Sequence, residues 1–145
     1  MIGNDVIDLA QSRIESRWQR NGFVEKLFTA NEQQYIKDFD QPETMVWLLW
    51  SMKEAAYKIY NRKTKVREYS PKKLSCSLDT LSLNLAFGKV SCNENVYYTK
   101  TIFSLESIHT IAVDDQENID HVIEVAGKKI VKDENGIPYL KAGNT

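Results

Sequence analysis

Two carboxylates, one near the start of the chain and one in a predicted helix, are suited to holding a magnesium ion. Asp5 follows a glycine at the start of a predicted strand, and Glu54 lies in the middle of the helix. Mg²⁺ takes oxygen ligands and is usually held by one or two carboxylates, with substrate phosphates and waters completing its shell. A carboxylate from a strand and one from a helix face therefore predict a Mg²⁺ site that also takes a phosphate-bearing substrate.

The helix that carries Glu54 is predicted from its apolar periodicity. Between Glu43 and Tyr60, apolar residues recur at spacings of four and three, which is typical of a helix with a buried face. These residues are Met45, Leu49, Met52, Ala56 and Ile59. The opposite face carries Trp47, Trp50, Ser51, Glu54, Tyr57 and Lys58. Large aromatic side chains are seldom left fully in water, so this face is predicted to line a cleft. The alternative is a solvated face with a Glu54 to Lys58 surface pair.

The strand that carries Asp5 is predicted over Ile2 to Leu9. Gly3 is expected to allow either an unusual backbone angle or a close approach to another element. Asp5 and Asp8 also precede the first predicted helix, so capping of that helix is the alternative role for both carboxylates.

The remaining elements predict one α+β domain over residues 1–145, with helices packed on one face of a mostly antiparallel sheet. Helices are expected over Ala10 to Arg20 and over Ala30 to Phe39, the second with a Thr29 to Glu32 capping box. Strands are expected over Leu81–Phe87, Val96–Leu105, Ser107–Val113, Lys128–Lys132 and Ile137–Leu140, with a hairpin turn at Asn93-Glu94-Asn95.

The composition limits the classes of protein to be considered. The chain has 145 residues, a formal net charge of -1 and a pI of about 6.1, so it lacks the sustained basic surface of a nucleic-acid binder. No apolar run approaches a membrane span, and an acidic N-terminal segment argues against a signal peptide. The two cysteines, Cys76 and Cys92, lack metal-ligand spacing. We therefore expect a cytoplasmic protein that binds neither membranes nor nucleic acid.

A basic segment follows the long helix. It contains Arg62, Lys63, Lys65, Arg67, Lys72 and Lys73. Such a segment suits a small anionic ligand or an acidic partner, and the alternative is a solvated lysine-rich loop.

These motifs resemble those of the 4'-phosphopantetheinyl transferase superfamily. Its signatures are a Gly-x-Asp near a strand and a Trp-x-x-Lys-Glu-Ala/Ser-x-x-Lys helix. Gly3-Asn4-Asp5 matches the first signature, and Trp50 through Lys58 matches the second at every specified position. The intervening Phe23, Phe28, Thr29 and Glu32 and the later Asn135-Gly136-Ile137-Pro138-Tyr139 turn are also similar to the family's pattern. The chain length is closer to the compact holo-acyl-carrier-protein synthase type than to the two-lobed type.

The resemblance implies an activity and a role for each residue. Such enzymes move the 4'-phosphopantetheine arm of coenzyme A onto a serine of an apo acyl or peptidyl carrier protein. By this analogy Asp5 and Glu54 would hold Mg²⁺ and Lys58 would lie at the phosphates. Glu54 or a metal-bound water would accept the serine proton. Lys53, Arg62 and Lys63 are weaker candidates for contacts with the coenzyme A phosphates.

The resemblance also implies a docking surface for an acidic carrier protein. Arg13, Arg17 and Arg20 are spaced to form a basic stripe on the first predicted helix, roughly where the family docks its carrier. The alternative is an ordinary exposed helix face.

Two departures from the family pattern bear on activity and assembly. The second acidic residue of the two-lobed type is replaced by Ile7, and the sequence stops at Thr145, before the family's Ser-x-Ser-His strand. Ser107-Ile108-His109-Thr110 looks similar to that motif but is expected to be a plain strand. Loss of the strand would remove coenzyme A contacts unless another subunit covers the gap. The alternative function is therefore a catalytically impaired homologue that binds a carrier protein or coenzyme A.

Compact relatives form trimers with the site between subunits, whereas two-lobed relatives are monomers.

Overall fold

The computed structural model describes residues 1–65, 69–115, 119, 130–132 and 138–140, the last two ranges by their backbone. The helices are α1 (Leu9–Glu15), α2 (Phe23–Leu27), α3 (Ala30–Asp38), α4 (Pro42–Thr64) and the 3₁₀ helix η1 (Pro71–Lys73). The strands are β1 (Ile2–Asp8), β2 (Leu74–Leu81), β3 (Leu85–Cys92), β4 (Asn95–Phe103), β5 (Ser107–Val113), β6 (Ile130–Lys132) and β7 (Pro138–Leu140).

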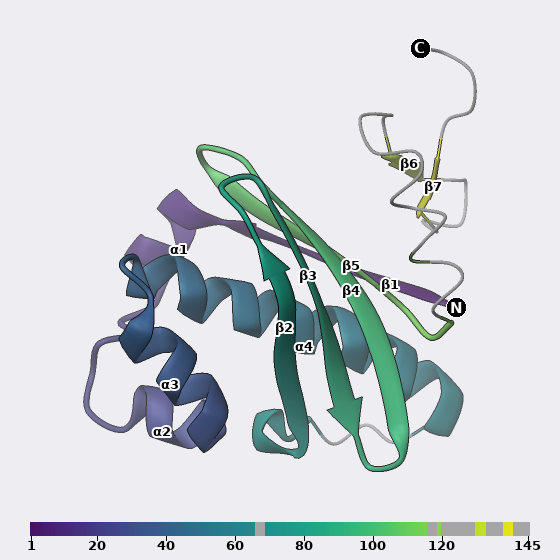
Figure 1. The fold of residues 1–145 in the computed structure, drawn as a ribbon, viewed down its shortest axis with the longest axis horizontal. Coiled ribbons are helices and arrows are strands. Elements are labelled where there is room, and N and C mark those ends of the chain that lie inside the picture. Colours follow the sequence, from purple (N-terminus) through teal and green to yellow (C-terminus); the bar gives the residue numbers. More distant parts are fainter. Residues whose placement is uncertain (66–68, 116–118, 120–129, 133–137, 141–145) are drawn as a thin grey trace.

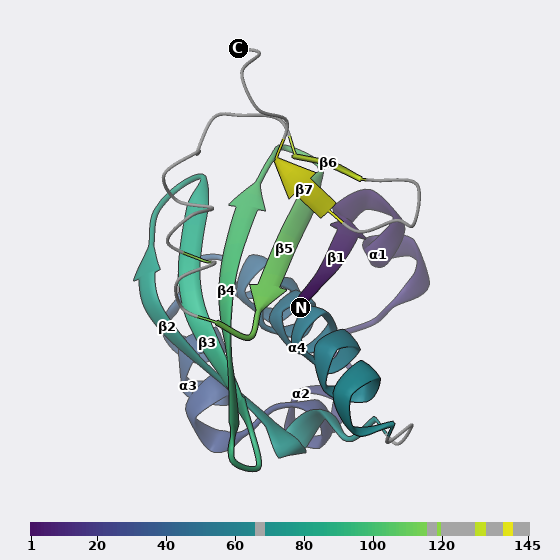
Figure 2. The ribbon, with the colours of Figure 1, turned by 90° about the vertical axis from the view of Figure 1, so that its right-hand side faces the viewer.

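Five of these strands form one antiparallel sheet in the order β1-β5-β4-β3-β2. Figures 1 and 2 show α4 running along one face of this sheet, with α2 and α3 on the same side. The first and last strands of the core are far apart in sequence, yet β1 pairs with β5 along its whole length. The predicted α+β class, with helices on one face of an antiparallel sheet, is confirmed.

The central helix α4 is longer than predicted. Pro42 occupies its first turn, where the missing N–H costs little, and the helix ends at Lys65 in a left-handed conformation with φ 61°. The side chains of the predicted apolar stripe are all fully or almost fully buried: Met45, Leu49, Met52, Ala56 and Ile59. The stripe packs against the sheet, so periodicity identified the correct core face.

Local capping and turn signals gave correct results in three places. Thr29 and Glu32 form the predicted capping box at the start of α3. Asp8 caps α1 by accepting a hydrogen bond from the Gln11 N–H, as the capping alternative expected. The hairpin turn at Asn93 joins β3 to β4, and that residue has a positive φ of 55°.

The strand predicted over Leu81–Phe87 is wrong. This stretch spans the turn between β2 and β3, where Ser82 donates its N–H to the Leu85 carbonyl at 2.8 Å. Leu83 is 88% exposed at the tip, so its alternation with neighbouring leucines does not reflect burial. The preceding strand β2 and the short helix α2 were missed.

The first helix is also shorter than predicted. It ends at Glu15, because Ser16 adopts an extended conformation and donates its N–H back to Ser12. The chain then turns so that Trp18 packs against the core. A helix over Ala10 to Arg20 is therefore wrong in its second half.

The last predicted hairpin is present as strands β6 and β7, which pair antiparallel with Ile130 opposite Leu140. The Gly-x-Pro turn at 135–137 lies outside the described residues, and Pro138 is the first residue of β7.

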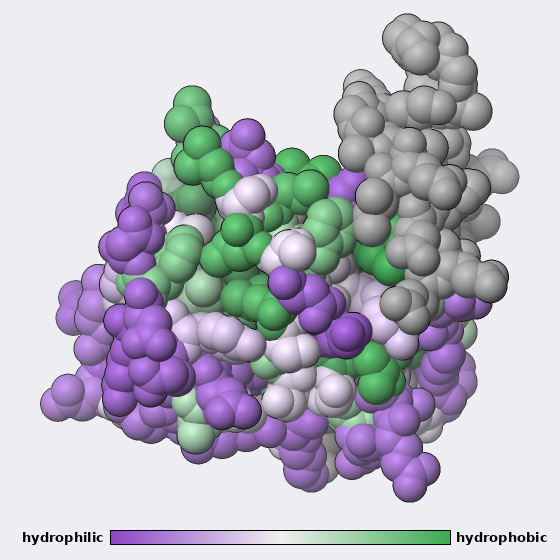
Figure 3. Space-filling model, viewed as in Figure 1, coloured by the Kyte–Doolittle hydropathy of each residue, from purple (hydrophilic) through white to green (hydrophobic). Residues whose placement is uncertain are grey.

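The sheet face turned away from α4 carries exposed apolar side chains. Val6 and Ile102 flank His109 in one row across β1, β5 and β4, and they are 56% and 39% exposed. Figure 3 shows apolar surface in the middle of this face. Among the described residues, no helix combines the length and apolar character needed to cross a bilayer.

Gly3 brings β1 into direct contact with α4, and its replacement tests that contact. A Cβ added at Gly3 would lie 2.1 Å from the backbone carbonyl oxygen of Ala55. The Gly3→Ala change is therefore expected to lower the free energy of unfolding by about 2 to 3 kcal/mol, as overpacked cores do. Urea denaturation followed by circular dichroism measures this.

Asn4→Ala provides a neighbouring control, because side chains alternate along a strand and Asn4 points to the other face of β1. We expect it to lose less than half as much stability as Gly3→Ala. Equal stability of the Gly3→Ala variant and the wild type would contradict a close packing of β1 on α4.

Candidate active site

Asp5 reaches α4 because β1 is packed closely against that helix. It lies opposite Thr110 of β5, a fully buried residue on the face that meets α4. The side chain is near Ser51 and Lys58 of α4. Burial raises the pKa of the Asp5 carboxyl above its ordinary value, and the positive charge of Lys58 partly offsets this.

Glu54 presents the second carboxylate from the middle of α4. Burial is the largest cause that raises its pKa, and the negative charge of Asp5 is the second. The mutual effect shows that the two carboxylates lie close enough to repel each other, although they are far apart in sequence. That Asp5 and Glu54 hold one metal ion together stays a prediction.

Lys58 bridges the two elements that carry the carboxylates. Its Nζ donates a hydrogen bond to the Asn4 carbonyl at 2.5 Å and lies 3.7 Å from an Asp5 carboxylate oxygen. The side chain is 44% exposed, so Lys58 is open to solvent. It is therefore not paired with Glu54 in the way that the surface-pair alternative expected.

Two enclosed hydroxyls, those of Ser51 and Tyr69, face this cluster. The Ser51 hydroxyl contacts the Asp5 carboxylate, and the Tyr69 hydroxyl contacts the Glu54 carboxylate. Each contact lowers the pKa of its carboxyl and so favours the charged form. Neither hydroxyl makes a hydrogen bond of ordinary geometry with a described residue. The ring of Tyr69 packs edge-on against Trp50 and Tyr57, which closes one side of the site.

The donor set is suited to a divalent cation that shares its shell with a substrate. A doubly charged cation would relieve the repulsion between the Asp5 and Glu54 carboxylates, and both offer the oxygen ligands that Mg²⁺ prefers. Within the described ranges there is no group of three or more His, Cys, Asp or Glu side chains that could hold a metal. Substrate phosphates and waters would have to supply the remaining ligands.

The segment that contains these residues matches a known family. Residues 1–110 match ACPS, the 4'-phosphopantetheinyl transferase superfamily, and this range includes Asp5, Glu54 and Lys58. The chain belongs to this superfamily. Its members act on carrier proteins, use coenzyme A as substrate and generally require a divalent metal. The family predicted from the two sequence signatures is confirmed.

The fold of this superfamily member also matches a solved structure. The crystal structure of Thermotoga maritima holo-[acyl-carrier-protein] synthase aligns with a TM-score of 0.55, over 97% of this chain and 82% of that chain. The sequence identity is 9%, so the likeness establishes the fold alone. No curated protein sequence matches the chain.

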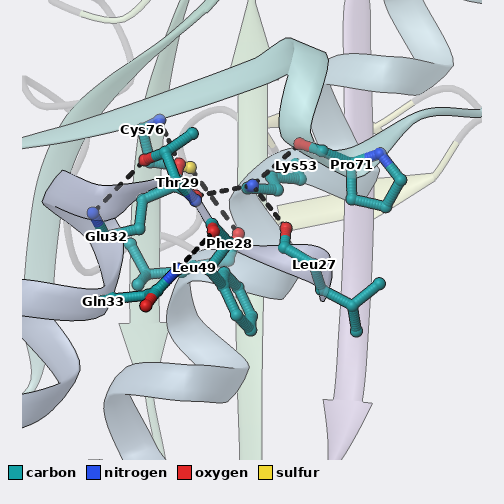
Figure 4. Close-up of polar contacts among 9 residues, drawn as sticks. All are labelled: Leu27, Phe28, Thr29, Glu32, Gln33, Leu49, Lys53, Pro71 and Cys76. Carbon is teal, nitrogen blue, oxygen red and sulfur yellow. Dashed lines mark hydrogen bonds and ion pairs between the residues drawn. The ribbon is translucent and has the colours of Figure 1, made fainter. Parts of the chain in front are cut away.

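Lys53 of the transferase signature does not lie where a coenzyme A contact was predicted. Its side chain is fully buried, and Nζ lies 2.6 Å from a carboxylate oxygen of Glu32. It also donates to the carbonyls of Leu27 at 3.0 Å and Pro71 at 2.8 Å, and it lies over the Phe28 ring (Figure 4). The structure does not support the predicted contact, because this ammonium is enclosed and saturated with acceptors.

Trp47 was placed on the open face of the transferase helix, and this is wrong. It is 6% exposed and its ring meets Phe23 edge-on at 6.5 Å. The helix α2 and the following turn cover this part of α4, so the buried arc of the helix is wider than a single apolar stripe. Trp50 is half-buried and packs against Tyr69.

Arg62 and Lys63, the other candidates for coenzyme A phosphates, lie on the last turns of α4 beside β1. Arg62 donates to the Ile2 carbonyl at 2.8 Å, and Lys63 contacts Asp114 at 2.5 Å. Both side chains are exposed. Lys58 and Arg62 both lie along the free edge of β1, whereas Lys63 is ion-paired beyond the end of β5. Arg67 of the same segment lies outside the described residues.

The three arginines predicted for carrier docking do not form a stripe on one helix. Arg13 lies on α1 and is paired with Glu43 at 2.7 Å, whereas Arg17 and Arg20 follow the end of that helix. Arg20 lies over the Phe23 ring at 5.3 Å. The helical spacing argument fails because α1 ends at Glu15, and docking at these residues stays a prediction.

Ser51 could be singled out from the sequence as a residue near the site, whereas Tyr69 could not. Ser51 was predicted on the open face of the helix, but it is fully buried and lies beside Asp5. Tyr69 was missed, because it follows α4 in a segment whose path depends on tertiary contacts. Its neighbours in sequence are basic and polar, so they carried no signal for a buried aromatic side chain.

Proposed function

We propose that this protein transfers the 4'-phosphopantetheine group of coenzyme A to a serine of an apo acyl or peptidyl carrier protein. In this proposal it is a transferase of the holo-[acyl-carrier-protein] synthase type. The observation that carries the proposal is the meeting of Asp5 and Glu54 beside Lys58, from β1 and α4 of a superfamily member.

The reaction breaks a P–O bond of the coenzyme A pyrophosphate and forms a phosphodiester bond to the serine oxygen. The serine oxygen attacks the phosphorus that carries the pantetheine arm, and the bond from that phosphorus to the adenosine-side phosphate breaks, which releases 3',5'-ADP. Reactions of this kind depend on in-line positioning and charge stabilisation more than on covalent enzyme chemistry. Lys58 supports this role, because its ammonium lies 3.7 Å from an Asp5 carboxylate oxygen and its side chain is open to solvent.

Asp5 and Glu54 would hold Mg²⁺ through their carboxylates. When bound, the cation would offset the negative charge that develops on the phosphates. Glu54 is also suited to accept the proton of the attacking serine at a carboxylate oxygen, since its raised pKa makes it a stronger base than an exposed glutamate. Lys58 would stabilise the leaving phosphate or protonate it.

The same proposal assigns surfaces to the two substrates. Arg62 and Lys63 would attract the remaining phosphates of coenzyme A from the last turns of α4, where Arg62 continues the positive edge that begins at Lys58. An acidic carrier protein would dock near Arg13, Arg17 and Arg20. Arg13 lines a groove of about 670 Å³ at the start of α4, which also supports binding of a partner there.

The proposal includes the assembly and compartment. A homotrimer is supported by the exposed apolar side chains Val6 and Ile102 on the open sheet face. A reducing cytoplasm suits the two free, buried cysteines, Cys76 and Cys92.

A direct test follows the mass of the carrier protein. The protein is incubated with coenzyme A, Mg²⁺ and a panel of apo carriers from fatty-acid, polyketide and peptide synthesis. We expect at least one carrier to gain one phosphopantetheinyl group and 3',5'-ADP to appear in equal amount. The gain should be lost with excess EDTA and restored by added Mg²⁺. If no carrier is modified while coenzyme A still binds by calorimetry, the transferase proposal is wrong.

A further inference from the structure

Tyr69 lies over Glu54 although it belongs to a different segment of the chain. Its ring centroid is 5.7 Å from that of Trp50 and 4.7 Å from that of Tyr57, with interplanar angles of 73° and 88°. Trp50 and Tyr57 stand about one helical turn before and after Glu54 on α4. The ring of Tyr69 is therefore held by both of the aromatic side chains that flank the carboxylate.

The hydroxyl of Tyr69 approaches the Glu54 carboxylate without forming a hydrogen bond of ordinary geometry. It is enclosed, and it makes no hydrogen bond of ordinary geometry with any described residue. A phenol hydroxyl carries its proton at neutral pH, so this group can donate. Enclosed hydroxyls in proteins are nearly always hydrogen-bonded, so an unpaired one beside a carboxylate indicates a bond that forms in the working site.

The path of the segment that carries Tyr69 is fixed by the buried Lys53. Lys53 precedes Glu54 on α4 but points away from it, into the core, where it donates to the Pro71 carbonyl at 2.8 Å. Figure 4 shows this contact together with the Glu32 ion pair and the Leu27 carbonyl. The same turn of α4 thus presents Glu54 on one side and anchors the Tyr69 segment on the other.

We propose that Tyr69 is a positioning residue for the transfer reaction. Its hydroxyl donates a hydrogen bond to one oxygen of Glu54 when the site is loaded, which leaves the other oxygen turned toward Asp5. The ring packs against Trp50 and Tyr57, and the hydroxyl orients the Glu54 carboxylate. The inference rests on the proposed function, because Glu54 is the carboxylate to which the transfer is assigned.

Replacement of Tyr69 by phenylalanine separates these two parts of the side chain. Tyr69→Phe keeps the ring contacts with Trp50 and Tyr57 and removes only the unpaired hydroxyl. We expect kcat for carrier modification to fall about tenfold, the effect of losing one hydrogen bond to a charged group. The KM for coenzyme A should change less than about twofold, because the ring contacts are kept. The melting temperature should stay the same or rise, since no hydrogen bond of the free protein is lost.

A second readout does not depend on turnover. The melting temperature is measured against Mg²⁺ concentration in the presence of coenzyme A, and the half-saturating concentration is compared between proteins. We expect Tyr69→Phe to require several-fold more Mg²⁺ than the wild type, because one Glu54 oxygen is no longer fixed.

Tyr35→Phe is the matched control. The Tyr35 hydroxyl accepts the N–H of Leu78 at 3.3 Å, away from the carboxylates, so its loss removes a real hydrogen bond. We expect this variant to melt at a lower temperature with unchanged kcat and unchanged Mg²⁺ requirement, the reverse of Tyr69→Phe.

The outcomes separate the two proposals. Wild-type kcat and Mg²⁺ requirement in Tyr69→Phe would overturn the positioning role, and so would a lower melting temperature with unchanged kcat. If the wild type modifies no carrier, the proposed function fails, and the Mg²⁺ titration alone then decides the role of Tyr69. Equal Mg²⁺ requirements in the two proteins would overturn it.

Discussion

Replacing Glu54 by glutamine is expected to slow phosphopantetheinyl transfer by about 100- to 1,000-fold, the range for loss of one preorganised charged group in an active site. The protein should nevertheless stay folded, and its melting temperature at neutral pH should be unchanged or higher. Glutamine has nearly the same size and shape, so the change tests the charge of residue 54 rather than its packing.

The stability part of this prediction follows from the direction of the pKa shift. Burial and then the charge of Asp5 raise the pKa of Glu54 above its ordinary value of 4.5, so the folded protein holds this proton more tightly than the unfolded chain does. The stability that this group contributes is fully present below its unfolded pKa. It is lost as the pH rises through the folded pKa. Asp5 shifts in the same direction and therefore acts with the same sign. At neutral pH the wild type carries two charged groups that its fold disfavours, and the Glu54→Gln variant carries one fewer.

Two measurements check the prediction on one set of samples. Carrier modification is followed by mass spectrometry at saturating coenzyme A, and melting temperatures are recorded between pH 4 and pH 8. The rise in stability toward low pH should be smaller in Glu54→Gln than in the wild type. Glu94→Gln, an exposed change in the β3–β4 turn, is the control and should leave both quantities unchanged. Transfer within tenfold of the wild-type rate in Glu54→Gln would remove Glu54 from the reaction.

The parts of the site that could be predicted are those whose position depends on one element. Glu54 and Lys58 follow from the periodicity of a single helix, which has a strong apolar stripe to fix its orientation. Gly3 was informative because a glycine at the start of a strand indicates a close approach, and the contact with Ala55 confirms it. Asp5 was placed beside that helix for two reasons: a Mg²⁺ site needs carboxylate ligands, and the family's two signatures contain Asp5 and Glu54.

The parts that could not be predicted depend on contacts between elements. Lys53 has the sequence features of an exposed lysine, and its burial requires a Glu32 carboxylate from α3 and two carbonyls from other segments. Tyr69 is brought to the site by that same set of contacts. The arginine stripe failed for a simpler reason, since it extended a helical spacing past Glu15, where the helix ends.

Replacing Lys53 by methionine is expected to lower the free energy of unfolding by about 3 to 5 kcal/mol, as removal of one partner from a buried ion pair does. Methionine fills a similar volume, but it leaves the Glu32 carboxylate without its counter-charge in a fully buried place. It also removes the hydrogen bonds that the carbonyls of Leu27 and Pro71 accept from Lys53. A domain of this size is stable by only about 5 to 15 kcal/mol, so the loss is a large part of the total.

A double-variant cycle distinguishes a lost ion pair from poor packing of the new side chain. Glu32→Gln removes the charge, although it disturbs the hydrogen bond that Glu32 accepts from the Cys76 N–H at 2.6 Å. If the uncompensated charge dominates, Lys53→Met combined with Glu32→Gln should lose less stability than the sum of the single changes, by about 1 to 3 kcal/mol. Urea denaturation of the four proteins measures the coupling.

The exposed pair of Lys89 and Asp79 is the matched control for this cycle. Its nitrogen and oxygen are 3.6 Å apart, and the two side chains are 41% and 46% exposed. Solvent screens such a pair, so Lys89→Met should change the free energy of unfolding by less than about 1 kcal/mol. An equally small effect of Lys53→Met would mean that the buried network does not hold the fold together. The Tyr69 segment would then need another anchor, because Lys53 is the side chain that ties the Pro71 carbonyl to the helix presenting Glu54.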